Sequence, residues 1–144
     1  MRLSLGYPDR ESELSILEDN PAGNVLNNLE PVLSAKDFIA AKEAAAAVFC
    51  HQSLKEAVID IVRDTRINKS FSLGASPRAT LHYLEAARAL AIVRGRDYVI
   101  DEDLLLLAAL VLAHRVRFRN PRAQGEKIIR EICLGRLNRI KTGI

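Results

Sequence analysis

The sequence contains no tryptophan, and aromatic residues make up only 5% of its 144 residues. It also lacks a long hydrophobic run, since the apolar stretch at residues 104–112 is too short to cross a membrane and is flanked by charge. No secretory signal is visible near the N-terminus, so we expect a cytoplasmic protein with no membrane partner. Cys50 and Cys133 lack the spacing of a metal or redox motif, which predicts two buried free thiols in a reducing compartment.

The main parts of an autonomous nucleotide hydrolase are missing as well. No glycine-rich loop ends in Lys-Ser/Thr to cradle phosphates, and no hydrophobic strand ends in paired acidic residues to hold Mg²⁺. His51, His82 and His114 are far apart and show no zinc pattern, and no Gly-x-Ser-x-Gly motif is present. The acidic residues 101–103 suit the first turn of a helix without any metal. We therefore expect no metal site and no catalytic activity from this chain alone.

Alanine and leucine are abundant instead, and hydrophobic residues make up 49% of the chain. Such a composition favours helices that pack closely through small side chains, and the length suits one domain with its own core. We predict an all-α fold, a compact helical bundle with at most a minimal two-strand pairing. The expected helices cover about 10–18, 35–49, 54–66, 77–94, 102–114 and 123–140, and the expected strands, 71–73 and 98–100, pair with each other.

Polar residues and glycine predict where several of these helices begin and end. Capping boxes are expected at residues 34–37 and 53–56, and Asp9 and Asp101 are expected to cap two further helices. Gly95 is expected to end the helix before it, because glycine readily adopts the left-handed conformation that follows a helix.

A turn-rich segment, residues 19–24, separates the first two helices. The loop that continues from this segment to Pro31 has apolar residues within it and directly after it. Leu26, Leu29 and Val32 are expected to anchor this loop to the core.

The stretch at residues 73–80, Leu-Gly-Ala-Ser-Pro-Arg-Ala-Thr, predicts a loop that opens a helix. Gly74 lets the incoming chain bend, Ser76 is a favourable N-cap, and Pro77 suits the first helical position. Arg78 then lies in the first turn, where the helix dipole attracts anions and a cation is mildly unfavourable. An arginine in this place indicates an anion such as phosphate, while the alternative is a surface ion pair with Glu85 or Asp64.

Several segments together resemble the C-terminal lid of MoxR-family AAA+ ATPases. They are the Gly-Ala-Ser-Pro-Arg-Ala-Thr motif with residues 81–97 after it, Leu-Gly-Tyr-Pro at 5–8 with the following helix, residues 28–34, residues 98–103 and Ala-His-Arg at 113–115. Each motif alone is weak, but the ordered set covers about residues 1–118 in the family's order and spacing. The resemblance implies a linker at residues 1–8, the lid at 9–118 and a C-terminal helical extension at 119–144.

The resemblance also implies a function. Arg78 matches the family's sensor-2 arginine, which reaches the γ-phosphate of ATP bound with Mg²⁺ by the preceding α/β subdomain. Ser76 and Pro77 would aim this arginine, and Tyr7 and Pro8 would lie near the adenine or simply connect the two subdomains. The implied partners are the α/β ATPase subdomain, neighbouring subunits of a ring that is usually hexameric, and proteins with von Willebrand A-type domains. The family's members resemble chaperones, and the chain starts where their α/β subdomain ends.

The charge distribution leaves a second interpretation open. Residues 1–60 hold five Lys/Arg against ten Asp/Glu, whereas residues 61–144 hold sixteen against eight. A basic helical module that binds nucleic acid would use Arg115, Arg117, Arg119, Arg122, Lys127, Arg130, Arg136, Arg139 and Lys141. Aromatic residues are not interleaved with these cations, so a solvated face is favoured and nucleic acid is not expected. Arg88 and Arg94 are further candidates for contacts with a neighbouring subunit, and a third interpretation is a stand-alone adaptor that binds a protein through an apolar helix face.

Overall fold

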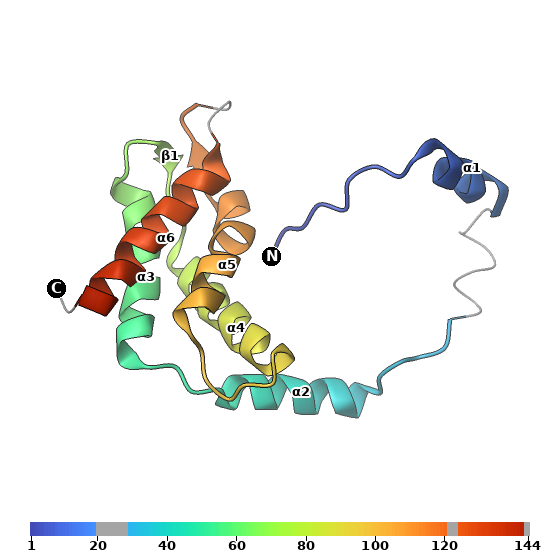
Figure 1. Cartoon of the computed structure of the whole chain (residues 1–144), viewed down its shortest axis with the longest axis horizontal. Coiled ribbons are helices and arrows are strands. Elements are labelled where there is room, and N and C mark those ends of the chain that lie inside the picture. The colour runs from blue at the N-terminus through green and yellow to red at the C-terminus, as the bar shows by residue number, and fades with distance from the viewer. Residues whose placement is uncertain (20–28, 121–123, 143–144) are drawn as a thin grey trace. The chain divides into compact units, whose positions relative to one another are not determined.

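The computed structural model describes residues 1–19, 29–120 and 124–142. Within them the chain forms six helices, a 3-10 turn and two short strands (Figure 1). In order, these are α1 (Arg10–Asp19), α2 (Ala35–Ala47), α3 (Gln52–Ile67), β1 (Phe71–Leu73), α4 (Pro77–Val93), α5 (Asp101–Leu112), η2 (Ala113–Arg115), β2 (Arg117–Phe118) and α6 (Gly125–Thr142). The all-α prediction is confirmed, and each expected helix is present. The turn predicted at 19–24 lies almost wholly outside the described residues.

The chain divides into two compact units, which we describe separately. The larger unit contains residues 1–2 and 41–144, and the smaller one contains residues 3–40. In the larger unit, α3, α4, α5 and α6 form the bundle, with α4 against α5 and α6 against both α3 and α5 (Figure 1). The C-terminal helix, expected as an extension, therefore buries Ile129, Cys133 and Leu137 in the same core as the other helices.

Small side chains line the buried face of α4. Ala79, Ala87 and Ala91 are fully buried there, together with Tyr83. The Tyr83 hydroxyl donates a hydrogen bond to the Leu104 carbonyl of α5 and lies 3.5 Å from the Cys133 Sγ of α6. This polar contact joins three helices, and it satisfies a buried hydroxyl that would be costly if unpaired.

Cys50 and Cys133 are free and buried, as predicted. Burial raises the pKa of both thiols, because an apolar environment disfavours the charged thiolate. Both sulfurs therefore act as small hydrophobic groups of the core.

The strand prediction is half right. Residues 71–73 form β1, but their antiparallel partner is β2 and not residues 98–100. The rings of Phe71 and Phe118 lie 5.1 Å apart, so an aromatic pair supports the observed partner. Tyr98 instead makes an isolated parallel bridge with Phe49.

Two predicted caps are wrong, whereas two others are confirmed. Asp9 and Ser34 cap α1 and α2, with Asp37 completing the capping box. The cap of α3 is His51 and not Ser53, because the His51 Nδ1 accepts the Ser53 N–H at 3.2 Å.

Helix α5 begins one residue earlier than the predicted cap implied. Ile100 is the N-cap, and Asp103 in the first turn accepts the Ile100 N–H. Asp101 is therefore the first helical residue and not the cap.

Buried Asp103 also fixes the connection between α4 and α5. Gly95, with φ +68°, ends α4 as predicted. The following Arg96 donates two hydrogen bonds of 2.7 and 2.9 Å to the Asp103 carboxylate. Arg94 approaches the same carboxylate at 3.5 Å. Hydrogen bonding to Asp103 raises the pKa of Arg96, which stays charged. The carboxylate is fully buried, but three donors satisfy it.

The smaller unit holds no buried side chain among its described residues. Leu29 and Val32, which were expected to anchor a loop to the core, are 67% and 93% exposed, and Leu26 lies outside the described residues. Leu14 and Leu17, three positions apart on α1, are both exposed. A hydrophobic pattern marks a face that can be buried, but this unit by itself supplies nothing to cover it.

Among the described residues, no helix combines the length and the hydropathy that a membrane crossing needs.

Candidate functional site

The residues around Arg78 were the candidate site, and the structure places them at the first turn of α4. Ser76 is the N-cap and Pro77 the first helical residue, as predicted. The Ser76 side chain makes no capping hydrogen bond, which corrects the role expected of its hydroxyl. The Ala79 N–H, which such a hydroxyl would satisfy, instead donates to the Ser76 backbone carbonyl at 2.9 Å. Backbone geometry and Pro77 therefore define the start of the helix.

The loop before this turn is held against the end of α3. The Thr65 Oγ1 accepts the Ala75 N–H at 2.9 Å, and the Arg66 Nε donates to the Ala75 carbonyl at 2.8 Å. Both backbone groups of one residue are thus paired with neighbouring side chains of one helix. Gly74 lies so close to α3 that an added Cβ would be 2.6 Å from the Arg66 Cα. Close approach, and not a positive φ, is the reason for glycine here.

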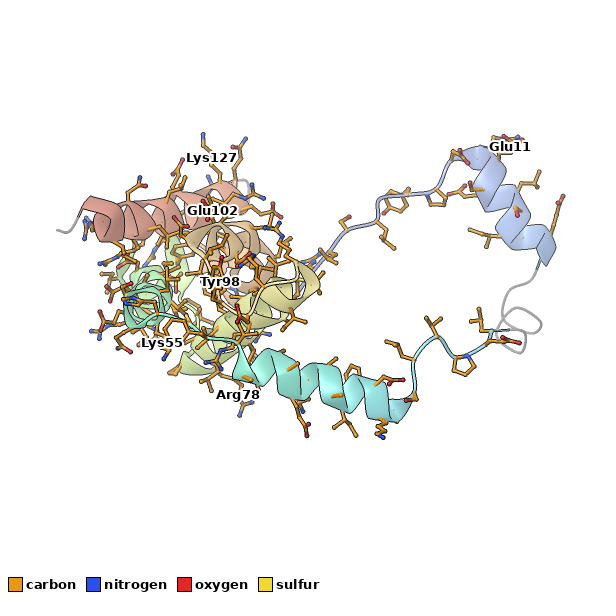
Figure 2. All side chains as sticks on the ribbon, turned by 60° about the horizontal axis from the view of Figure 1, so that its bottom comes forward. Glu11, Lys55, Arg78, Tyr98, Glu102 and Lys127 are labelled. Carbon is orange, nitrogen blue, oxygen red and sulfur yellow. The ribbon has the colours of Figure 1, made fainter. Side chains whose placement is uncertain are left out.

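Arg78 itself is exposed and has no ion pair among the described residues (Figure 2). The two carboxylates proposed as its alternative partners are bonded elsewhere. Glu85 lies 3.3 Å from the His82 Nδ1, and Asp64 accepts two hydrogen bonds from Arg136 at 2.6 and 2.7 Å. The guanidinium is therefore available to a ligand or partner. Leu81, one turn further along α4, is also exposed.

Two further residues of the predicted site lie in the other unit of the chain. Tyr7 and Pro8 belong to the smaller unit, and both are exposed, Tyr7 to 98%. Arg94, suggested as a contact for a neighbouring subunit, is engaged with Asp103.

The basic face expected for nucleic acid is interrupted where the structure describes it. Arg136 is held by Asp64 and by Asp60, whose carboxylate lies 3.2 Å from the Arg136 Nη1. Hydrogen bonding to Asp64 raises the pKa of Arg136, so its guanidinium stays charged. Arg122 and the Lys141 side chain lie outside the described residues. Arg136 is thus used within the bundle.

Thr65 and Arg66 were missed by the sequence reasoning. In the sequence, both fit the amphipathic pattern of a helix and need no further role. Their hydrogen bonds go to Ala75, which is nine or ten positions away in the chain. The one available signal was the glycine at 74, which indicated a bend but not the surface that it contacts. No group of His, Cys, Asp and Glu side chains suited to a metal ion occurs within the described ranges.

Comparison with known proteins identifies this architecture. Residues 63–132 match the AAA lid domain family, and these residues include all of α4 with the Arg78 turn, and part of α6. A solved structure of a candidate ATPase from Cytophaga hutchinsonii has the same fold, with a TM-score of 0.69 and 29% identity over 92% of this chain and 44% of that one. The helical bundle is therefore an AAA lid domain.

Two curated relatives narrow the class. The chain is 38% identical over 136 residues to the YeaC protein of Bacillus subtilis, and 34% identical over 145 residues to the chaperone MoxR1 of Mycobacterium tuberculosis. These matches cover 91% and 94% of this chain but only 42% and 38% of the two relatives. The chain is thus a lid domain of the MoxR family of AAA+ ATPases, and it spans about two fifths of the length of the curated relatives it matches.

Proposed function

We propose that this chain is the nucleotide-sensing lid of a MoxR-like AAA+ ATPase and that Arg78 is its sensor-2 arginine. The observation that supports this role is the exposed, unpaired guanidinium in the first turn of α4, within the part of the described chain that matches the lid family. Guanidinium suits the role because it stays charged and offers a fork of donors to phosphate oxygens.

In this proposal, ATP and Mg²⁺ are bound by an α/β subdomain that belongs to the same protein. Residues 1–8 link that subdomain to the lid at 9–118, and Tyr7 and Pro8 lie at the hinge near the base. Lid closure brings Arg78 to the phosphates, where it stabilises the charge of the transferring group and responds to its loss. Ser76 and Pro77 set the direction of the helix that carries it.

The relatives suggest the setting of this cycle. MoxR1 is named a chaperone, and we propose a chaperone-like role for the whole protein. Closure and opening of the lid would move neighbouring subunits of a homo-oligomeric ring, for which a hexamer is the expected state. Proteins with von Willebrand A-type domains are the expected partners, and a cytoplasmic location fits this role.

The test joins this chain to the remaining part of the Bacillus subtilis relative and measures ATP turnover. We expect Arg78→Ala to lower kcat by about 100-fold, because a charged donor to the transferring phosphate is lost. Arg78→Lys should restore only part of it, since lysine keeps the charge but not the fork. Ala89→Ser, at an exposed position of the same helix, is the control and should leave kcat unchanged.

Two outcomes would contradict the proposal. Equal turnover in Arg78→Ala and the parent would remove the sensor role. A folded chimera with no turnover at all would count against the lid assignment itself.

A further inference from the structure

We infer that Thr65 and Arg66 are positioning residues for Arg78: together with Gly74 they hold residue 75 against α3 and so set the direction of the first turn of α4. This inference rests on the proposed function for its consequence in turnover, but the contacts themselves belong to the chain alone. We name Thr65, Arg66 and Gly74 the α3 clamp.

The clamp holds both backbone groups of a single residue. Thr65 accepts from the Ala75 N–H, and Arg66 donates to the Ala75 carbonyl. Thr65 is fully buried, and its hydroxyl proton goes to the Val62 carbonyl at 2.7 Å, so the oxygen presents a lone pair to Ala75. The direction of each hydrogen bond is therefore determined.

The clamp lies directly before the start of α4. Ala75, itself buried, directly precedes the N-cap Ser76, and Arg78 follows two residues later. Because the Ser76 side chain makes no capping bond, the entry angle of α4 depends on what holds the residue before it. The clamp supplies that restraint from α3.

The arginine of the clamp, Arg66, makes a directed hydrogen bond. Arg66 is exposed, and its Nε donates a hydrogen bond to a backbone carbonyl. Within the part of the chain that the structure describes, it makes no ion pair. A lysine could not reproduce this bond with the same geometry, because its single ammonium lies at the end of a flexible stem. The residue is thus used for directed hydrogen bonding, which suits positioning.

The test begins with hydrogen exchange of this chain. Thr65→Val keeps the shape of the side chain but leaves the Ala75 N–H without a partner, and we expect the Ala75 and Ala79 amides to exchange at least about tenfold faster. The Ala108 and Ile129 amides, deep in α5 and α6, should keep their rates. Thr65→Ser, which retains the hydroxyl, should restore the protection.

A glycine pair provides a second, independent perturbation. Gly74→Ala places a Cβ 2.6 Å from the Arg66 Cα and 2.7 Å from the Thr65 carbonyl oxygen, so the loop has to move. Gly135→Ala, on α6, meets nothing within 4 Å and serves as the matched control. We expect the first variant to accelerate exchange at Ala75 and Ala79 and the second to leave it unchanged.

The turnover assay then asks whether the clamp acts through Arg78. In the chimera, Thr65→Val should lower kcat with little change in KM, and the double variant with Arg78→Ala should be no slower than Arg78→Ala alone. A general loss of stability would instead add to the effect of Arg78→Ala.

The outcomes separate the two claims. If Arg78→Ala leaves turnover unchanged, the proposed function fails, while exchange at Ala75 still decides whether the clamp exists. If Arg78→Ala is slow but Thr65→Val is fully active, the positioning role is overturned. It is also overturned if exchange at Ala75 and Ala79 is unaltered, or if all amides accelerate equally.

Discussion

His114, in the η2 turn that follows α5, shows how burial and charge act on one residue. Burial lowers the pKa of its imidazole, and the positive charges of the amino terminus, Arg115 and Arg2 lower it further. The folded state therefore disfavours protonated His114, whereas the unfolded chain protonates it near its ordinary pKa of about 6.5. Protonation at lower pH favours the unfolded chain.

This difference predicts a pH dependence of stability. The contribution of neutral His114 is complete above about pH 6.5 and is lost as the pH falls below that value, because the unfolded state then binds the additional proton. The free energy of unfolding, measured in urea between pH 8 and pH 5, should decline toward the acidic end. His114→Gln cannot bind that proton and should show a smaller decline. An identical decline in the variant would assign it to other groups.

Residues whose roles are local could be predicted from the sequence, whereas residues that act across the fold could not. Pro77 begins α4 and Gly95 ends it, each through its own backbone preference. Their positions in the sequence therefore predict the two ends of the helix. For Asp103, the sequence predicts only an acidic residue in the first turn of a helix. Its bonds to Arg96 require the turn after α4 to bring the two together, and this geometry is not visible in the spacing of acidic residues.

At the scale of elements, α4 depends on small side chains. Its buried alanines let the helix lie close to its neighbours in the bundle, where larger residues would collide. The same helix carries exposed residues on its other face, among them Ala89. Two alanines of one helix thus have opposite environments.

Enlarging these two alanines should give opposite results. Ala87→Leu forces extra methylene groups into a packed interior and should lower the free energy of unfolding by about 1–3 kcal/mol. Ala89→Leu keeps helix propensity and adds its side chain to the surface, so it should change stability by less than about 0.5 kcal/mol. Urea unfolding followed by circular dichroism measures both. Similar losses in the two variants would contradict the role assigned to close packing.

Helix positions were predictable because 3.6-residue periodicity and alanine content are properties of each segment alone. The strand pairing was not, since the choice of partner for β1 depends on which segments the bundle brings beside it. Phe71 and Phe118 are 47 positions apart in the sequence, and they pair in a bundle in which α4 packs against α5. The His51 cap was missed because imidazole is an uncommon acceptor at an N-cap.

At the scale of the whole molecule, the two units differ in what they can bury. The larger unit has a continuous core drawn from four helices, whereas the described part of the smaller unit exposes every side chain. Its exposed apolar residues include Leu5, Tyr7, Leu17, Val32 and Phe38. An exposed apolar set of this kind indicates an interaction surface.

The proposed lid role assigns this surface to the α/β subdomain, and binding in trans tests the assignment. The chain, mixed with the separately expressed remainder of the Bacillus subtilis relative, should bind it, and amide exchange in α1 should slow on binding. Leu17→Ser removes an exposed apolar side chain from α1 and should weaken the affinity about tenfold, because the lost burial corresponds to roughly 1.5 kcal/mol. Glu13→Ser on the same helix is the control and should leave the affinity unchanged. Binding unaffected by Leu17→Ser would place the contact elsewhere, and complete absence of binding would favour the adaptor interpretation, in which a different protein covers the exposed face of α1.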